Sequence, residues 1–283
     1  MKKITVLYSP LCEANGAFLG KLEEWLKDQE VEIEAIPYHK ASIEYKKAIG
    51  NNGNCFIHVF CDGKQIDTVP LHKDRIYSAL GITQMEEKVM QYCETSVYPI
   101  ISTESFKKAM KDGKITFLPI TKDSYQEEMT MCLCNYPMGN PPRKYHNRCR
   151  SIKEEVYQKV WERETIAGMF AKWNDKVIGL LEVFPREIIK QYGYLTGTTH
   201  KEEEYLTVGC YEIGYGIPRV IMIDALMDHL LQNANLFCRK KIEGIGIYEW
   251  PDGFNPYWVY EKYGFHKVEQ ITDHTIVMEK ILS

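Results

Sequence analysis

Residues 206–231 constrain the fold of this chain more than any other segment. They begin with the apolar run 206–210, which is typical of a buried strand, pass through a turn with Gly214 and Gly216, and continue as an amphipathic helix. Pro218 has a fixed φ that suits the first turn of a helix, and the amides after it can bind an anion. The segment predicts a strand–turn–helix unit with an anion site, although an ordinary strand-to-helix turn has the same pattern.

A second segment near the end of the chain carries a more specific pattern. Residues 245–248 form an apolar strand, Asn255 follows, and Tyr260 opens the run Tyr-Glu-Lys-Tyr-Gly-Phe before a last strand at 275–281. This resembles the Asn-x-x-x-x-Tyr-Glu-Lys-x-Gly-Phe signature of the GNAT N-acetyltransferase family. With the segment 206–231, the resemblance covers about residues 114–283.

The resemblance implies a pyrophosphate-binding loop at the start of the helix. The best register places Gly216 on the central glycine of the family's loop, Ile213 where Arg or Gln is usual, and Pro218 where Gly or Ala is usual. In this register the core face of the helix has apolar residues, as a period of 3.6 requires: Ile221, Met222, Ala225 and Leu226. Because Pro218 has no N–H, one donor of the loop is missing. The CoA-binding residues implied for the loop are Ile213, Gly214, Tyr215, Gly216, Ile217 and Arg219.

The resemblance also implies a gap in the sheet. In this family the strand 206–210 and the strand 245–248 splay apart, and the acyl arm of CoA enters between them, much as an added strand would. The implied main-chain partners are Leu206, Thr207 and Val208. Asn255 is similar to the residue that binds the pantetheine arm, and it is equally suited to be an ordinary N-cap.

Acyl transfer from a thioester to an amine needs a proton for the leaving thiolate. Tyr260 falls on the tyrosine of the family signature, and we predict that it is the proton donor, with Tyr263 on the next turn as an alternative. The general base is not readable from the sequence: Glu182, Glu204 and Glu212 lie on or beside central strands, where charged side chains commonly face solvent.

The first 82 residues predict a separate domain. Their pattern of elements is βαβαββα, with an Asp-Gly hairpin turn, and it resembles the thioredoxin/glutaredoxin fold. Cys12 stands at the expected helix start, but Asn15 replaces the second cysteine of a Cys-x-x-Cys site, so dithiol exchange within the motif is impossible. We expect an accessory domain that docks a partner or forms a homodimer, and a monothiol role of Cys12 stays open.

The segment 132–150, which is rich in basic residues, has two interpretations. Three cysteines and a histidine could form a zinc site, but Cys-x-Cys is tighter than the usual spacing, so we expect no metal: Cys132, Cys134, His146 and Cys149. A Pro-rich substrate loop with a basic rim is the favoured interpretation. The rim has four cations: Arg143, Lys144, Arg148 and Arg150.

The composition limits which classes of protein the chain can belong to. A net charge of −4 argues against a general nucleic-acid binder, and no apolar run approaches the ~20 residues of a membrane helix. Nine cysteines without regular spacing favour a reduced, cytoplasmic protein, and the apolar run at the N-terminus is too short for a signal peptide.

The sequence therefore predicts an α/β (α+β) protein of three parts. These are a thioredoxin-like domain at 1–82, a helical linker at 83–113, and a GNAT-like domain at 114–283 with a mixed, splayed sheet flanked by helices. The predicted function is acetyl-CoA-dependent N-acetyltransfer to a small-molecule amine. The alternatives are a CoA-binding or sensing protein without turnover and a monothiol redox protein centred on Cys12.

Overall fold

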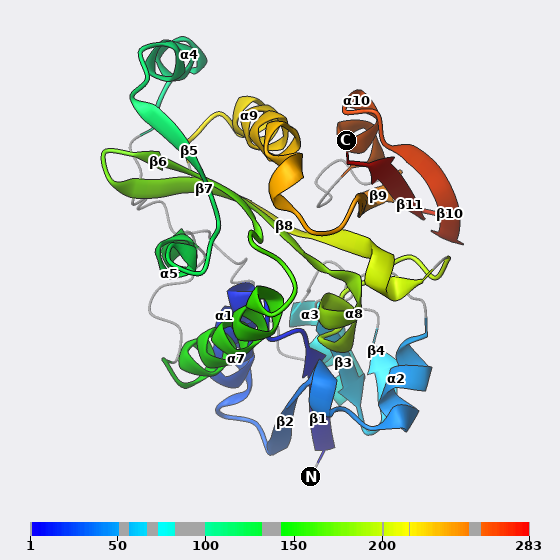
Figure 1. Ribbon diagram of the computed structural model, residues 1–283. Coiled ribbons are helices and arrows are strands. Elements are labelled where there is room, and N and C mark those ends of the chain that lie inside the picture. The colour runs from blue at the N-terminus through cyan, green and yellow to red at the C-terminus, as the bar shows by residue number, and fades with distance from the viewer. Residues whose placement is uncertain are drawn as a thin grey trace. The chain divides into compact units, whose positions relative to one another are not determined.

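Figure 1 shows the computed structural model of the chain. It describes residues 2–50, 57–66, 73–82, 100–131, 143–199, 201–214, 216–248 and 256–282. The chain divides into two compact units. The first comprises Met1–Cys93, Tyr136–Lys153 and Gln191–Leu195, and the second comprises Glu94–Asn135, Glu154–Lys190 and Thr196–Ser283.

The first unit contains a four-stranded sheet with the strand order β2–β1–β3–β4. β1 and β2 are parallel, whereas β3 is antiparallel to both β1 and β4. The turn between β3 and β4 has positive φ at Asp62 and Gly63, the type I′ geometry that an Asp-Gly hairpin predicts. The elements are β1 Lys2–Tyr8, α1 Glu13–Leu26, β2 Val31–Pro37, η1 Tyr38–Lys40, α2 Ile43–Ile49, β3 Ile57–Cys61, β4 Lys64–Ile66 and α3 Lys73–Leu80. Their order is the predicted βαβαββα; the likeness to the thioredoxin fold stays a prediction.

Both faces of this sheet are covered. Alternate residues of β1 and β3 contribute to one cluster with α1 and α3, and Tyr145 and Cys149 of helix α7 (Arg143–Trp161) complete it. On the other face, Leu7 and Phe60 pack with α2. The period of two in the strands therefore separates two cores, as a sheet covered on both faces requires.

The second unit is built on a seven-stranded sheet with the order β10–β11–β9–β8–β7–β6–β5. All neighbouring strands are antiparallel except β8 and β9. Figure 1 shows α9 and α10 above this sheet and α5 and α8 below it. The elements are α4 Thr103–Lys111, β5 Ile115–Pro119, α5 Tyr125–Glu128, β6 Gly168–Trp173, β7 Lys176–Pro185, α8 Arg186–Gln191, η2 Glu202–Glu204, β8 Tyr205–Ile213, α9 Arg219–Gln232, η3 Ala234–Leu236, β9 Lys241–Ile247, α10 Tyr257–Lys262, β10 His266–Thr272 and β11 Thr275–Ile281. The predicted mixed sheet flanked by helices is confirmed.

The predicted register of α9 agrees with its packing. Met222 and Leu226 are fully buried and Ala225 is nearly so, whereas Ile221 is only half-buried. Arg219 is exposed, as the chosen register requires.

Helix α7, Arg143–Trp161, was not predicted from the sequence. The substrate loop expected before residue 150 is wrong from Arg143 onward, because these residues are helical. The signal was present in buried residues that recur at helical spacing: Tyr145, Cys149, Ile152, Val156 and Val160. Contacts also assign 136–153 and 191–195 to the first unit, whereas the sequence placed both in the domain 114–283. Residues 132–142 lie outside the described residues.

None of the helices in the described ranges is both long enough and apolar enough to cross a bilayer.

We predict that the first unit loses stability in mild acid because of His58. This side chain lies on β3, is 6% exposed, and burial lowers its pKa to about 4. Its pKa in the unfolded chain is about 6.5, so the unfolded state binds the additional proton, and stability falls as the pH drops from about 6.5 to 4. The full loss in the free energy of unfolding is roughly 3 kcal/mol. Hydrogen exchange of β1 and β3 at pH 7 and pH 4.5 measures it.

The control variant replaces the exposed His266 with Gln, which should leave this pH dependence unchanged. His58→Phe should remove most of it. An equally steep loss in His58→Phe would contradict the assignment.

Candidate functional site

Strands β8 and β9 are hydrogen-bonded neighbours over a short distance. Three residues of each strand are in register: Tyr205, Leu206 and Thr207 with Lys241, Ile242 and Glu243. Beyond these pairs, both strands continue and stay paired with their outer neighbours β7 and β11, but no further register between β8 and β9 exists within the described residues. We call this opening, between residues 208–213 and 244–247, the splay. Its facing edges can accept an extended segment.

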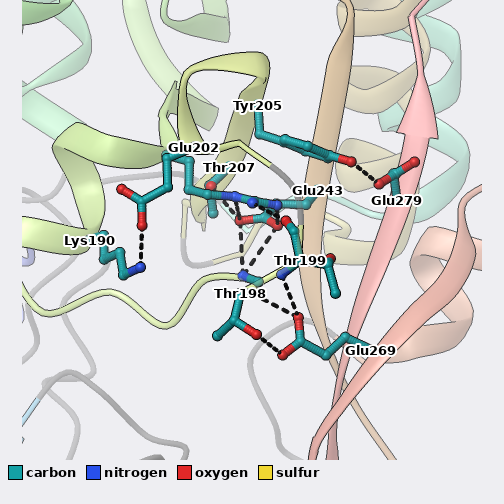
Figure 2. A network of polar contacts seen from close by, with 11 residues as sticks. Lys190, Thr198, Thr199, Glu202, Tyr205, Thr207, Glu243, Glu269 and Glu279 are labelled. Atoms are coloured by element: carbon teal, nitrogen blue, oxygen red, sulfur yellow. Dashed lines mark hydrogen bonds and ion pairs between the residues drawn. The ribbon is translucent and has the colours of Figure 1, made fainter.

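The point where the splay begins is fixed by a buried ion pair between Arg186 of α8 and Glu243 of β9. Figure 2 shows Glu243 and Thr207 within the network of polar contacts at this point. Glu243 accepts hydrogen bonds from Thr207 Oγ1 at 2.7 Å, from Arg186 Nε at 3.0 Å and from the Gly197 amide at 3.2 Å. Arg186 and Glu243 are 1% and 0% exposed. Burial raises the pKa of Glu243, and the bonds from Arg186, Thr207 and Gly197 oppose that rise. These bonds join α8, β8 and β9 at the last paired residues.

The segment between α8 and η2 is fixed to the same place. Arg186 Nη1 donates to the Thr199 carbonyl at 2.8 Å, and the Thr198 amide and hydroxyl donate to Glu269 at 2.7 and 2.6 Å. Tyr205 Oη donates to Glu279 on β11 (Figure 2). The closed end of the splay is therefore bonded to α8, β10 and β11 at once.

Tyr260 on α10 lies against the backbone of β9. A Cβ at Gly244 would overlap the Tyr260 ring, so this close approach requires glycine. Tyr260 is 0% exposed, and its hydroxyl has no hydrogen-bond partner among the described residues. Burial raises the pKa of this phenol, which keeps it protonated throughout the physiological range. The residue predicted to be the acid is thus a buried hydrogen-bond donor beside the splay.

Tyr263 has a different environment. Its hydroxyl donates to Asp224 Oδ1 at 2.7 Å, and Lys262 Nζ donates to Asp224 Oδ2 at 2.5 Å. These bonds link α10 to α9, so Tyr263 has a structural partner that Tyr260 lacks.

Tyr211 on β8 is a residue that the sequence analysis missed. The register between β7 and β8 shifts between Glu182 and Val183, which leaves one extra residue, Gly209, on β8. Such a bulge moves the following side chains to the other face. Tyr211 is 2% exposed and, like Tyr260, has a hydroxyl without a partner in the described part of the chain. Glycine inside an apolar strand was the available signal.

The glycine turn before α9 uses several of its own donors. The Gly214 amide donates to the Ile178 carbonyl at 2.9 Å, and the Ile217 amide donates to the Gly214 carbonyl at 3.0 Å. Gly216 has a φ of +88°, which explains the glycine. Pro218 is the N-cap of α9 and makes no side-chain cap, so the amides of residues 219–221 remain as helix-start donors. Tyr215 lies outside the described residues.

A buried acidic cluster lies on the opposite face of the sheet. Tyr157 Oη contacts Glu128 Oε1 at 2.5 Å and Glu182 Oε1 at 2.9 Å. Burial, together with the Glu128 and Glu182 carboxylates, raises the pKa of Tyr157, so its phenol stays protonated. Glu182 is 1% exposed, whereas Glu212 is half-buried and Glu204 is exposed with its carboxylate 2.8 Å from Lys241 Nζ.

Of the remaining predicted residues, the structure describes some and leaves others outside its described ranges. Ile213 is buried, and its side chain lies beside Gly179. Asn255 lies outside the described residues, as do Cys132 and Cys134. Within the described part, no group of three or more His, Cys, Asp or Glu residues is placed to hold a metal ion.

Comparison with known proteins gave neither a matching family model nor a matching curated protein. Among solved structures, the chain is similar to Naa50 of Arabidopsis thaliana in complex with the bisubstrate analogue CoA-Ac-MVNAL, with 11% identity and a TM-score of 0.36 over 59% of this chain and 98% of that one. The ribosomal-protein-S18-alanine N-acetyltransferase of Escherichia coli matches with 11% identity and a TM-score of 0.36 over 60% and 94%. An N-acetyltransferase of Staphylococcus aureus Mu50 matches with 9% identity and a TM-score of 0.39 over 60% and 99%. At TM-scores below 0.5, these similarities add nothing to the argument from strand pairing and side chains.

We predict that Glu243→Gln strongly destabilises the second unit, because it leaves the Arg186 charge buried without its counterion. Loss of one partner of a buried pair costs about 3–5 kcal/mol. The double variant Arg186→Met/Glu243→Leu should recover much of this loss. Urea denaturation followed by hydrogen exchange of β8 and β9 measures both.

The matched control is the exposed pair between Lys190 and Glu202, whose side chains are 44% and 42% exposed. Glu202→Gln should change stability by less than about 1 kcal/mol. Equal effects of the two Glu→Gln variants would contradict the role given to Glu243.

Proposed function

We propose that this protein is an acetyl-CoA-dependent N-acetyltransferase that acts on an amine, with a small molecule as the acceptor. The observation that carries the proposal is the splay between β8 and β9 beside the buried hydroxyl of Tyr260, which has no partner among the described residues. The splay supplies backbone edges for an extended acyl arm, and the phenol supplies a proton for a thiolate. This combination supports acyl transfer from a thioester.

The acyl arm would bind further along β8 than the sequence predicted. Leu206 and Thr207 are already paired with β9, so of the three predicted residues only Val208 lies beyond the paired stretch. At the far end of β9, Ile247 forms an isolated bridge with Pro256. The available edges are therefore residues 208–213 of β8 and 244–246 of β9.

The pyrophosphate would bind at the start of α9. Because the Ile217 amide is used within the turn and Pro218 has none, the donors available there are the amides of residues 219–221, supported by the exposed Arg219 side chain.

The reaction needs few groups. The neutral amine attacks the thioester carbonyl, the C–S bond of the tetrahedral intermediate breaks, and the sulfur takes a proton from Tyr260. The nitrogen loses one proton to a base. Of the predicted candidates, Glu182 is buried in the acidic cluster on the face of the sheet opposite Tyr260, and Glu204 and Glu212 remain open.

We predict that the chain binds acetyl-CoA and that Arg219→Glu weakens binding by about tenfold, which corresponds to about 1.4 kcal/mol. Isothermal titration calorimetry measures the Kd. Lys267→Glu, on the exposed edge strand β10, makes the same change in net charge and should leave the Kd unchanged. Absence of binding at millimolar acetyl-CoA would refute the proposal.

We predict that Tyr260→Phe lowers kcat and kcat/KM about 10²-fold, the scale for a lost general acid, while Kd for acetyl-CoA changes little. Thiol release with a panel of amines measures turnover. Tyr263→Phe is the matched control: it removes a bond to Asp224, so it should lower the melting temperature but keep turnover near wild type. A Tyr260→Phe variant with wild-type turnover would make this residue a core aromatic only.

Two other functions would each give a different experimental result. Tight CoA binding without thiol release from any amine would indicate a CoA-binding or sensing protein, which Ile213 and Pro218 in the loop favour. A redox role rests on Cys12, the N-cap of α1, where Asn15 is buried and donates to the Ser9 carbonyl at 2.6 Å. Activity toward a glutathione mixed disulfide that Cys12→Ser abolishes would support this role.

A further inference from the structure

Within the described ranges, two phenols at the splay have no hydrogen-bond partner, in contrast to other tyrosines of the same unit. In the same unit, the hydroxyls of Tyr157, Tyr205 and Tyr263 each contact a carboxylate. The hydroxyls of Tyr211 and Tyr260 contact no hydrogen-bonding group in the described part of the chain, although both residues are at least 98% buried. A buried hydroxyl without a partner costs free energy, and such groups in native proteins call for an explanation.

The bulge at Gly209 brings these two phenols to the same face. Gly179 pairs with Ile213, and a Cβ at Gly179 would contact Met222 of α9 and the Ile213 side chain, so this pair faces α9. Tyr211 lies two residues before Ile213 and therefore shares its face. Helix α10, which carries Tyr260, lies on this face as well, because Lys262 and Tyr263 of α10 donate to Asp224 of α9. Without the extra residue in β8, Tyr211 would face the opposite side of the sheet.

The charges around these phenols indicate what kind of ligand they suit. Burial raises the pKa of both phenols, so both are protonated donors at neutral pH. The carboxylates of Glu243 and Asp224 are already paired with cations, Arg186 and Lys262. Two neutral donors suit a neutral group with two adjacent acceptor atoms and no donor, and the carbonyl oxygen and sulfur of a thioester are such a pair.

We propose that Tyr211 is a second catalytic residue that donates its hydroxyl to the carbonyl oxygen of the acyl thioester, while Tyr260 donates to the sulfur. This inference rests on the proposed function. It assigns oxyanion stabilisation to a side chain that only the bulge brings into place.

In the proposed reaction the two phenols act on different atoms of the thioester. The amine nitrogen forms a bond to the carbonyl carbon, and the π electron pair moves to the oxygen, where the Tyr211 O–H binds the resulting anion. When the C=O bond re-forms, the C–S bond breaks, the sulfur keeps the electron pair, and it takes the Tyr260 proton. The phenolate of Tyr260 is neutralised by the proton that the nitrogen loses. The products are the amide and free CoA thiol.

The test uses acetyl-CoA labelled with ¹³C at the carbonyl and needs no acceptor. Hydrogen bonding to a carbonyl oxygen moves its ¹³C resonance downfield, so the resonance should move on binding to the wild-type chain. Tyr211→Phe should lose most of this shift, whereas Tyr260→Phe should retain it. In turnover assays, Tyr211→Phe should lower kcat by about 10²–10³-fold, as loss of one oxyanion donor does.

A purely structural role for Tyr211 makes the opposite predictions. Because its hydroxyl makes no bond to any described residue, Tyr211→Phe should melt at or above the wild-type temperature. A large fall in melting temperature, or a carbonyl resonance in Tyr211→Phe identical to that of bound wild type, overturns the proposal.

The wild-type result separates the two proposals. If wild type binds no acetyl-CoA, the proposed function and this inference fall together. If wild type binds it and shifts the carbonyl resonance, but Tyr211→Phe does so equally, only the role of Tyr211 is refuted.

Discussion

The ion pair between Arg186 and Glu243 determines where the large sheet opens. Both side chains are buried, and the Glu243 carboxylate also accepts bonds from Thr207 and Gly197. A charge in this place is tolerated only because every bond around it is made, so the four groups form as a unit. Thr207 and Glu243 are also the last paired residues of β8 and β9. The network therefore holds the two strands together at one point, and beyond that point they separate.

A second constraint is the extra residue in β8. A strand without a bulge would alternate regularly, and Tyr211 would lie on the face of the acidic cluster around Tyr157. The bulge at Gly209 places it instead on the face of α9 and α10, where Tyr260 lies over Gly244. Opening of the sheet and re-orientation of one side chain thus occur within a few residues of each other. Together they set two open backbone edges beside two phenols on one face of the sheet, which is the arrangement that the proposed acyl transfer uses.

Much of the fold followed from local patterns. The alternation along β2, the Asp-Gly hairpin and the glycine turn before α9 depend on residues close in the chain, so the sequence located them to within a few residues. Helix α7 was missed, since its basic first turns and the preceding prolines resemble a loop. Its buried face packs partly against β1 and α1, more than a hundred residues away in the chain. Propensity alone does not reveal such a contact.

The residues of the candidate site also fall into those that short sequence motifs indicate and those that only distant contacts determine. Tyr260, Gly216 and the exposed Arg219 were identified from the sequence, because each belongs to a short motif whose spacing reflects local geometry. The pairing of Arg186 with Glu243, 57 residues apart, could not be identified in that way. The starting point of the splay could not be identified from the sequence either. Because Leu206 and Thr207 are paired with β9, the available edge of β8 begins at Val208 and not at Leu206. Local chain geometry is encoded in neighbouring residues, whereas burial of a charge or an unpartnered hydroxyl depends on which distant segments fold over it.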